Sequence, residues 1–291
     1  MPEIIHKLFP AQAAVFSDQS PYVAAVTGIG GGKGYVLALK ALAYMNEHPK
    51  SLGMLTAPTF GMLKDATLRS VTEVFPEGSY SFHPGDMVLK YHNGAEMLAR
   101  STDDPAHLRG PNLSWVGMDE AARSEEEAAF ILQGRLRQKG FPPRMWFATT
   151  PNGFNWVYRW FKQNPKDGYA LHQWRTRDNP NLTEAFQKNL ESSYQGEFAL
   201  QELEGQFVAL SGTPFFDGAR LREMLDDCRE RLRGELGAIS IWRLPIVAGR
   251  YVAGGDLAWG ETGAYSCLEI LDFQTGEQVA EIHGRLPPDE M

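Results

Sequence analysis

Short apolar runs recur along the first half of the chain, and helix-like stretches separate them. The runs lie at residues 22–26, 52–55, 113–118 and 145–148. Strands that alternate with helices are typical of an α/β fold, in which helices cover both faces of a mostly parallel sheet. The pattern therefore predicts such a fold for the first two thirds of the chain, residues 1–210.

Two further patterns refine this prediction. Residues 87–99 predict a β-hairpin, because Asn93-Gly94 is a strong turn signal between two strand-like segments. Residues 183–204 are rich in Glu, Gln and Leu at helical spacing, and they follow an Asn-Pro-Asn turn. We expect these helices to form a small lid subdomain of about residues 160–210.

A glycine-rich turn follows the first apolar run and leads into a helix-like stretch. A strand, a loop that ends in Lys33 and a helix form a phosphate cradle, because bare backbone N–H groups converge on an anion at the helix's positive end. Against the P-loop pattern G-x-x-x-x-G-K-[ST], Thr27 replaces the first glycine and Gly34 replaces the hydroxyl that binds Mg²⁺. The loop predicts a nucleoside triphosphate site. The alternative is a flexible turn that caps a helix.

Two adjacent acids, Asp119 and Glu120, end the third apolar run. In a P-loop ATPase, a second parallel strand ends in acids that hold Mg²⁺ and orient the attacking water. We expect Asp119 to hold the metal and Glu120 to activate the water, from a strand adjacent to the strand of the loop. The alternative is an ordinary helix N-terminus, where carboxylates favour the positive end of the dipole.

Small hydroxyl residues follow two other runs, at residues 56–59 (Thr-Ala-Pro-Thr) and 149–153 (Thr-Thr-Pro-Asn-Gly). Both segments lie at the carboxyl ends of predicted strands, which is the edge where open α/β sheets collect their ligands. The alternative for both is plain turn chemistry ahead of a helix.

The order and spacing of these motifs resemble one family, the large terminase subunit of tailed bacteriophages. The resemblance also includes residues 9–12 (Phe-Pro-Ala-Gln), 108–110 (Leu-Arg-Gly), 202–207 (Glu-Leu-Glu-Gly-Gln-Phe) and 254–258 (Gly-Gly-Asp-Leu-Ala), so it covers nearly all of the chain. It implies a P-loop ATPase of the RecA-like (ASCE) type that uses ATP and Mg²⁺ to drive double-stranded DNA into a procapsid, together with an RNase H-like nuclease.

The resemblance assigns roles to single residues of the ATPase. Gln12 is similar to the glutamine that hydrogen-bonds the adenine edge, and Lys33 to the lysine that neutralises the β and γ phosphates. Asp119 is then the Mg²⁺ partner and Glu120 the catalytic base. The implied nucleotide-binding residues are Gln12, Gly28, Ile29, Gly30, Gly31, Gly32, Lys33 and Gly34.

Two more roles follow from the resemblance. Arg109 resembles the arginine finger that such motors insert into a neighbouring subunit's site, where a guanidinium matches the charge on the transferred phosphoryl group. Arg135 and Arg137 are further candidates for a trans-acting arginine. The motif that senses the γ-phosphate and relays its loss to the grip on DNA is similar to three residues of this chain: Thr149, Thr150 and Asn152.

Composition fits an intracellular protein of two domains. The chain has 291 residues, of which 43% are hydrophobic, and this exceeds the usual size of one domain. Its two cysteines are too few for a disulfide framework, which suits a reducing cytoplasm. The resemblance implies that this is the host cytoplasm, with transient docking on a procapsid portal. No run of 18 apolar residues predicts a membrane span.

The net charge of −8 argues at first against a nucleic-acid partner, but the distribution of charge differs from the total. Residues 134–177 hold nine basic side chains against one acid, interleaved with tryptophans. This segment predicts sequence-independent DNA contact; a solvated helix face or an intersubunit surface fits equally well. The DNA-binding candidates are Arg135, Arg137, Lys139, Arg159 and Lys162.

The last third of the chain reads as a separate region. Residues 211–247 are expected to form a linker and a charged helical segment at 216–237, followed by a partial RNase H-like domain at 248–291. Asp256 ends the first predicted strand and would be the first metal-binding carboxylate. Since cleavage by this fold needs several acids around two divalent cations, and the family's later acids lie beyond Met291, we expect no competent nuclease from this polypeptide alone.

Three hypotheses of function follow. The leading one is a motor subunit that works in a homo-oligomeric ring, of five subunits in the family, with a portal protein and a small terminase subunit as partners. The second is a nucleotide-binding structural subunit with weak catalysis, because Gly34 lacks the metal's hydroxyl. The third is a helicase-like or repair ATPase that acts on free duplex.

Overall fold

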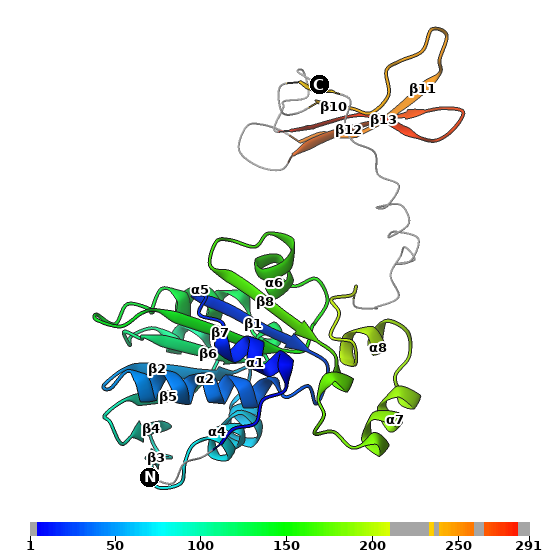
Figure 1. Cartoon of the computed structure of the whole chain (residues 1–291). Coiled ribbons are helices and arrows are strands. Elements are labelled where there is room, and N and C mark those ends of the chain that lie inside the picture. The colour runs from blue at the N-terminus through cyan, green and yellow to red at the C-terminus, as the bar shows by residue number, and fades with distance from the viewer. Residues whose placement is uncertain (1–4, 210–232, 236–238, 259–264, 285–291) are drawn as a thin grey trace. The chain divides into compact units, whose positions relative to one another are not determined.

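The predicted apolar runs are strands of one eight-stranded sheet in the order β3-β4-β5-β2-β6-β7-β1-β8 (Figure 1). From β5 to β8 the neighbours pair in parallel, whereas β3 and β4 are antiparallel. This confirms the mostly parallel α/β fold and the hairpin, which is β4 and β5. The strands are β1 (Tyr22–Thr27), β2 (Leu52–Ala57), β3 (Tyr80–His83), β4 (Val88–Tyr91), β5 (Glu96–Ser101), β6 (Trp115–Asp119), β7 (Arg144–Thr149) and β8 (Tyr169–Trp174).

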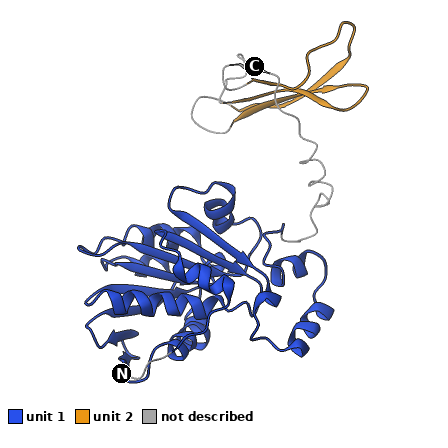
Figure 2. Ribbon diagram, viewed as in Figure 1, with its two compact units in different colours: residues 1–212 blue, residues 213–291 orange. Residues whose placement is uncertain are grey.

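This computed structural model describes residues 5–209, 233–235, 239–258 and 265–284. It contains two compact units, residues 1–212 and 213–291 (Figure 2). Within the described ranges, no helix has the length and apolar character needed to cross a membrane.

Helices cover both faces of the sheet in the first unit. Val23 and Ala25 of β1 belong to one core with α1, α2 and α4, while Ala24 and Val26 belong to a second core with α5 and α6. Successive strand residues point to opposite faces, so both faces of β1 are buried. The helices described are α1 (Pro10–Ser17), α2 (Lys33–Glu47), α3 (Phe60–Met62), α4 (Leu68–Val74), α5 (Glu126–Gln133), α6 (Trp156–Tyr158), α7 (Glu184–Ser193) and α8 (Gly196–Glu202).

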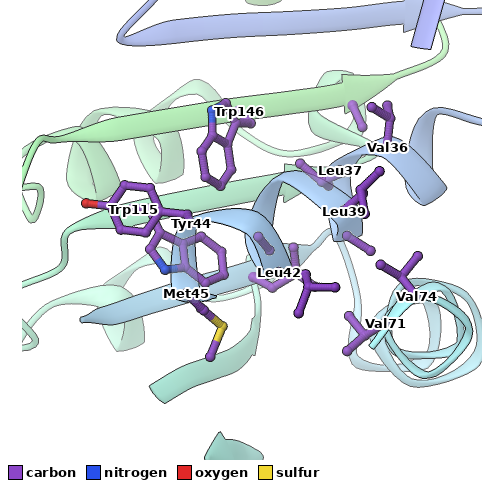
Figure 3. Packing of buried hydrophobic residues seen from close by; sticks show 14 of the residues in the cluster. Val36, Leu37, Leu39, Leu42, Tyr44, Met45, Val71, Val74, Trp115 and Trp146 are labelled. Atoms are coloured by element: carbon purple, nitrogen blue, oxygen red, sulfur yellow. The ribbon is translucent and has the colours of Figure 1, made fainter. Parts of the chain in front are cut away.

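The first core fixes the position of α2 (Figure 3). Trp115 of β6 stacks on Trp146 of β7, with ring centroids 5.6 Å apart, and Tyr44 of α2 packs against both rings. On the other side of α2, Val71 and Val74 pack against it from α4. Because α2 is held between the sheet and α4, its amino end has a defined place at the edge of the sheet.

The position of β8 corrects the predicted lid. Residues 169–174 lie inside the range assigned to the lid, but they form the edge strand of the main sheet, parallel to β1. Most side chains of β8 are only half-buried, so the segment lacks the apolar run that revealed the central strands. The helices α7 and α8 alone remain as the lid-like part.

A second correction concerns the order of the central strands. The sequence predicts that the strand of the loop and the strand of the two acids are adjacent, but β7 lies between β1 and β6. β7 pairs in parallel with both, through Val26↔Thr149 on one side and Asp119↔Ala148 on the other. The carboxyl ends of all three strands therefore still meet at one edge of the sheet.

The second unit contains an antiparallel sheet in the order β11-β12-β13-β10-β9. β11 and β12 form an antiparallel hairpin, and Asp256 ends β11 as predicted. The predicted charged helix at 216–237 lies mainly outside the described residues, and its part at 233–235 is a strand instead, because it pairs with β10. The strands are β9 (Arg233–Glu235), β10 (Ile239–Ile241), β11 (Tyr251–Asp256), β12 (Ser266–Asp272) and β13 (Gln278–Gly284).

Candidate functional site

A cavity of about 890 Å³ opens where the carboxyl ends of β1 and β6 meet the amino end of α2. Its volume is in the range of small-molecule sites in proteins. The predicted site residues that line it are Gln12, Gly30, Gly31, Gly32, Lys33, Gly34, Asp119 and Glu120. The structure therefore brings together the loop and the acid pair, which are more than 80 positions apart in the sequence.

The amino end of α2 lacks the groups that usually compensate a helix N-terminus. Within the described part of the chain no side chain caps the helix, and no acid lies in its first turn. Gly32, the residue before the helix, has a left-handed backbone with φ 79°, which favours glycine. The first N–H groups of a helix have no intrahelical acceptor, so this end is suited to bind an anion.

Four side chains donate hydrogen bonds to the carbonyl groups of the loop. They are Thr176 Oγ1 to Ile29 O (2.8 Å), Asn179 Nδ2 to Gly30 O (2.7 Å), Trp174 Nε1 to Gly31 O (2.8 Å) and Gln12 Nε2 to Gly32 O (3.0 Å). Engaged carbonyls are kept from repelling a bound anion, so the loop's N–H groups can face it. Three of these donors were missed from the sequence because they lie in or after β8, which was not predicted; polar residues at a strand's carboxyl end were the available signal.

Side chains also pack closely against two glycines of the loop. A Cβ added to Gly32 would lie 2.6 Å from Gln12 Nε2, and one added to Gly31 would lie 2.1 Å from Thr27 Oγ1. The hydroxyl of Thr27 is buried and has no hydrogen-bond partner among the residues that the structure describes. Gly30, Gly31, Gly32, Lys33 and Gly34 line the cavity, so a ligand can approach the loop from there.

Lys33 contacts the residues that directly follow β6 and β7. Its Nζ is 3.0 Å from Glu120 Oε1 and donates to Thr150 Oγ1 at 3.0 Å. Both charged side chains are mostly buried, with 12% and 22% of their surface exposed. An ammonium group at this place can meet a terminal phosphate, the predicted base and a predicted coupling residue together.

Glu120 has an unusual backbone conformation. Its φ of 46° and ψ of 43° place a non-glycine residue in the left-handed region directly after β6. Such strain persists where the surroundings fix it, and it is common at functional sites. Here it turns the chain sharply between the strand and the short turn η3 (Ala121–Arg123) while Glu120 faces Lys33.

Asp119 is held by two hydrogen bonds. Its Oδ2 accepts from Thr67 Oγ1 at 2.7 Å, and its Oδ1 accepts from the N–H of Glu120 at 3.1 Å. Burial raises the pKa of this carboxyl group, while the bond from Thr67 and the charge of Lys33 oppose the shift. A buried, oriented carboxylate suits a divalent cation that brings its own charge. Thr67 was not recognised from the sequence.

The three predicted coupling residues have different neighbours. Thr150 contacts Lys33, as described above. Thr149 Oγ1 accepts from the N–H of Ala122 at 3.1 Å, and Asn152 Nδ2 donates to the carbonyl of Ala122 at 3.4 Å. Thr149 and Asn152 therefore contact the turn that follows Glu120, so the segment connects the base and the lysine through its side chains.

Arg109 lies outside the cavity of its own chain. It follows the turn η2 (Pro105–Leu108), its side chain is 59% exposed, and its Nη2 is 3.5 Å from Glu127 Oε1. Arg135 and Arg137 lie in the connection between α5 and β7, at the amino end of β7 and thus at the opposite edge of the sheet. None of these three arginines lines the described cavity.

The predicted DNA contacts come from two segments. Arg135, Arg137 and Lys139 precede β7, whereas Arg159 and Lys162 belong to the π turn η4 (Arg159–Gln163). Arg159 is paired with Glu126, at 2.6 Å between Nη2 and Oε2.

The tryptophans interleaved with this basic stretch serve the fold instead. Trp156 and Trp174 are buried, and their indole N–H groups donate to the carbonyls of Ser124 and Gly31. Trp160 Nε1 donates to Glu126 Oε1 at 2.8 Å. The two buried rings therefore offer no surface for contact with DNA.

In the second unit, Asp256 ends β11 opposite Cys267 of β12. Glu269 and Glu281 are paired across β12 and β13 on the same face, and ligand atoms of Cys267, Glu269 and Glu281 lie within 4.8 Å of one another. Asp272, in contrast, is engaged by Arg243 and by the turn after β12. Glu269 lies on β12, the strand that pairs with the strand of Asp256, and it was not predicted as a site residue.

Comparison with known proteins relates the chain to large terminase subunits. Residues 25–220 match the family described as "Terminase large subunit, T4likevirus-type, N-terminal". The PBSX phage terminase large subunit of Bacillus subtilis (strain 168) is 28% identical over 164 residues, or 54% of this chain and 38% of that protein. The large terminase subunit of Thermus phage G20c is 26% identical over 93% of this chain and 61% of that protein. This chain thus spans less than two thirds of either relative.

Solved structures agree with the fold. The large terminase of a thermophilic bacteriophage superposes with a TM-score of 0.63 at 17% identity, over 96% of this chain and 69% of that one. The large terminase ATPase domain of Thermus phage P74-26 gives 0.55 at 22% identity, over 70% and 95%. The first of these two proteins has also been solved in complex with ADP. With a P-loop ATPase fold, a loop and acid pair at one cavity, and a family match over most of its length, the chain belongs to the large terminase subunits of tailed bacteriophages.

Proposed function

We propose that this chain is the ATP-hydrolysing motor subunit that translocates double-stranded DNA into a viral procapsid. The observation that supports this best is the cavity in which the uncapped amino end of α2, Lys33 and the pair Asp119 and Glu120 meet. An end of a helix that favours anions, a buried ammonium group and two carboxylates are the set that phosphoryl transfer to water requires.

The chain's own residues divide the work in the proposed reaction. The loop's N–H groups and Lys33 bind the phosphates, and the carboxylate of Asp119 would bind Mg²⁺. When bound, Mg²⁺ neutralises charge on the phosphate oxygens. Glu120 takes a proton from the attacking water, and its contact with Lys33 orients the carboxylate. Thr150, which accepts a hydrogen bond from the ammonium group of Lys33, would sense the γ-phosphate.

Phosphate release in the presence and absence of duplex DNA tests the proposal. Wild-type protein should hydrolyse ATP with stimulation by DNA. Lys33→Ala should lose both binding and turnover, whereas Glu120→Gln should bind ATP with unchanged affinity and lose turnover by at least about a hundredfold. Loss of ATP affinity in Glu120→Gln equal to that in Lys33→Ala would contradict the assignment of the base.

A structural subunit that binds nucleotide without turnover is the second candidate. Gly34 favours it, because the P-loop hydroxyl that usually binds Mg²⁺ is missing. Wild-type phosphate release no faster than that of Lys33→Ala, together with retained ATP binding, would support this candidate over the motor. The helicase-like alternative instead predicts unwinding of a forked duplex.

The remaining partners are also proposals. A ring of these subunits, five in the family, would act in the host cytoplasm on a portal protein, with a small terminase subunit that delivers the DNA. We propose sequence-independent backbone contacts for the exposed basic residues of the segment 134–177. For the second unit we propose an incomplete nuclease site, in which Asp256 is the first metal ligand and which does not cut DNA alone. Cleavage requires further carboxylates around two divalent cations.

A further inference from the structure

The hydroxyl that the P-loop lacks has a neighbour from another helix. A Cβ added to Gly34 would have Ser70 Oγ as its nearest atom, at 3.2 Å. Ser70 belongs to α4 and lines the same cavity as Lys33, Asp119 and Glu120. The space into which a side chain at position 34 would extend therefore already contains a hydroxyl group.

The segment directly before α4 holds the predicted metal-binding acid. Thr67 Oγ1 donates to Asp119 Oδ2 at 2.7 Å, and both groups are buried. Thr67 lies three residues before Ser70, and of the two only Ser70 lines the cavity. Thr67 ends a π turn, η1 (Leu63–Thr67), which leads directly into α4. Such turns are rare in proteins, and those that occur are often at functional sites.

The position of α4 is fixed by packing. Val71 and Val74 bury their side chains against α2, whose first turn carries Lys33 and Gly34 (Figure 3). Ser70 thus has a defined distance from the loop, as a residue of the loop itself would. A shift of α4 would require the core between α2 and α4 to repack.

The hydroxyl oxygen of Ser70 can coordinate a divalent cation. The hydroxyl is half-buried and donates to the carbonyl of Ala66 at 3.4 Å, a long bond within the helix. A hydroxyl has one hydrogen to donate and two lone pairs, so this bond leaves the lone pairs available. Divalent cations such as Mg²⁺ are bound by oxygen atoms of this kind.

We propose that Ser70 supplies, from α4, the hydroxyl oxygen for the divalent cation of the nucleotide complex, in the place that P-loops give to the residue after their lysine. The inference depends on the proposed nucleotide site. It explains how a loop with Gly34 can retain a metal site, since the ligand comes from α4, directly after the turn whose Thr67 binds Asp119.

Nucleotide affinity with and without metal tests the inference. Binding of a non-hydrolysable ATP analogue is titrated in Mg²⁺ and in EDTA. Ser70→Ala should lose about tenfold of the affinity in Mg²⁺ and none in EDTA. Thr72→Ala is the matched control, because Thr72 is an exposed hydroxyl residue of the same helix that donates to the carbonyl of Arg69. It should change neither value. The affinity of the nucleotide complex for Mn²⁺, measured by electron paramagnetic resonance, should fall in Ser70→Ala and stay unchanged in Thr72→Ala.

Moving the hydroxyl back to the loop gives the decisive variant. Gly34→Ser combined with Ser70→Ala should restore the Mg²⁺-dependent affinity, because the truncated Ser70 leaves room for the new side chain. Equal losses in Mg²⁺ and EDTA, unchanged affinity in Ser70→Ala, or failure of the double variant to recover would each overturn the inference. Wild-type protein that binds no nucleotide in either medium would instead contradict the proposed function, and with it the inference.

Discussion

At the scale of single residues, the site depends on where the loop's carbonyl groups point. Trp174, buried at the end of β8, donates to the carbonyl of Gly31 at 2.8 Å. A hydrogen bond of this kind contributes about 1 kcal/mol, so its loss allows the loop to adopt other conformations. We expect Trp174→Phe to lower ATP affinity about fivefold, as measured by equilibrium titration.

Trp156→Phe is the matched control for this prediction. Trp156 is equally buried, and its indole donates at 2.8 Å to the carbonyl of Ser124 rather than to the loop. Both variants should lose similar thermal stability. A comparable loss of ATP affinity in both would show that the effect of Trp174 is general destabilisation and not orientation of the loop.

Sequence patterns revealed those residues whose chemistry is local. Lys33, Asp119 and Glu120 were predictable because each follows an apolar run that forms a central strand. Thr67, Ser70 and Trp174 were not, because their roles arise from contacts across the fold. Nothing in the sequence near Ser70 indicates that α4 brings it to Gly34.

At the scale of elements, one buried lysine ties α1 to α2. Lys40 is 5% exposed, and its Nζ donates to the carbonyls of Val15, Phe16 and Asp18 at the end of α1. This fixes the helix that carries Gln12 against the helix that begins at the loop. Burial lowers the pKa of Lys40 to about 8, although the charge of Asp18 opposes the shift.

This pKa predicts a pH dependence with a defined sign. Between about pH 8 and the ordinary pKa of 10.5, the unfolded chain holds a proton that the folded chain has lost, so the folded state gains relative stability as pH rises. Relative to Lys40→Met, the wild type should gain on the order of 3 kcal/mol over this range. Denaturant unfolding followed by tryptophan fluorescence measures the difference. A difference that is constant with pH would contradict the prediction.

The elements themselves were predicted in proportion to their burial. The central strands are apolar on both faces, which left a clear pattern, and the hairpin had its Asn-Gly turn. The edge strand β8 has mostly half-buried side chains, so it was merged into the lid. The insertion of β7 between β1 and β6 depends on tertiary pairing, which the order of motifs along the chain does not specify.

At the scale of the whole molecule, the position of Arg109 points to a neighbour. The side chain is largely exposed and outside its own cavity. If it completes the site of an adjacent subunit, Arg109→Ala and Glu120→Gln should each be inactive alone. Mixing them should restore up to about a quarter of wild-type ATPase, because some interfaces then combine an intact arginine with an intact glutamate.

Controls for this experiment come from the other arginines. Arg137→Ala lies at the opposite edge of the sheet and should keep its hydrolysis without a partner. Failure of the Arg109→Ala and Glu120→Gln mixture to recover, under conditions where the subunits assemble, would place the finger at another residue. Loss of activity in Arg137→Ala with recovery on mixing would identify that residue instead.

The central claim is that a triphosphate binds between the amino end of α2 and the two acids that follow β6. A crystal structure with a non-hydrolysable ATP analogue and Mg²⁺ tests it most directly. The account predicts phosphates on the loop's N–H groups, with the terminal phosphate beside Lys33 and between it and Glu120. A nucleotide bound elsewhere on the chain, or a cavity that stays empty at saturating concentration, would contradict it.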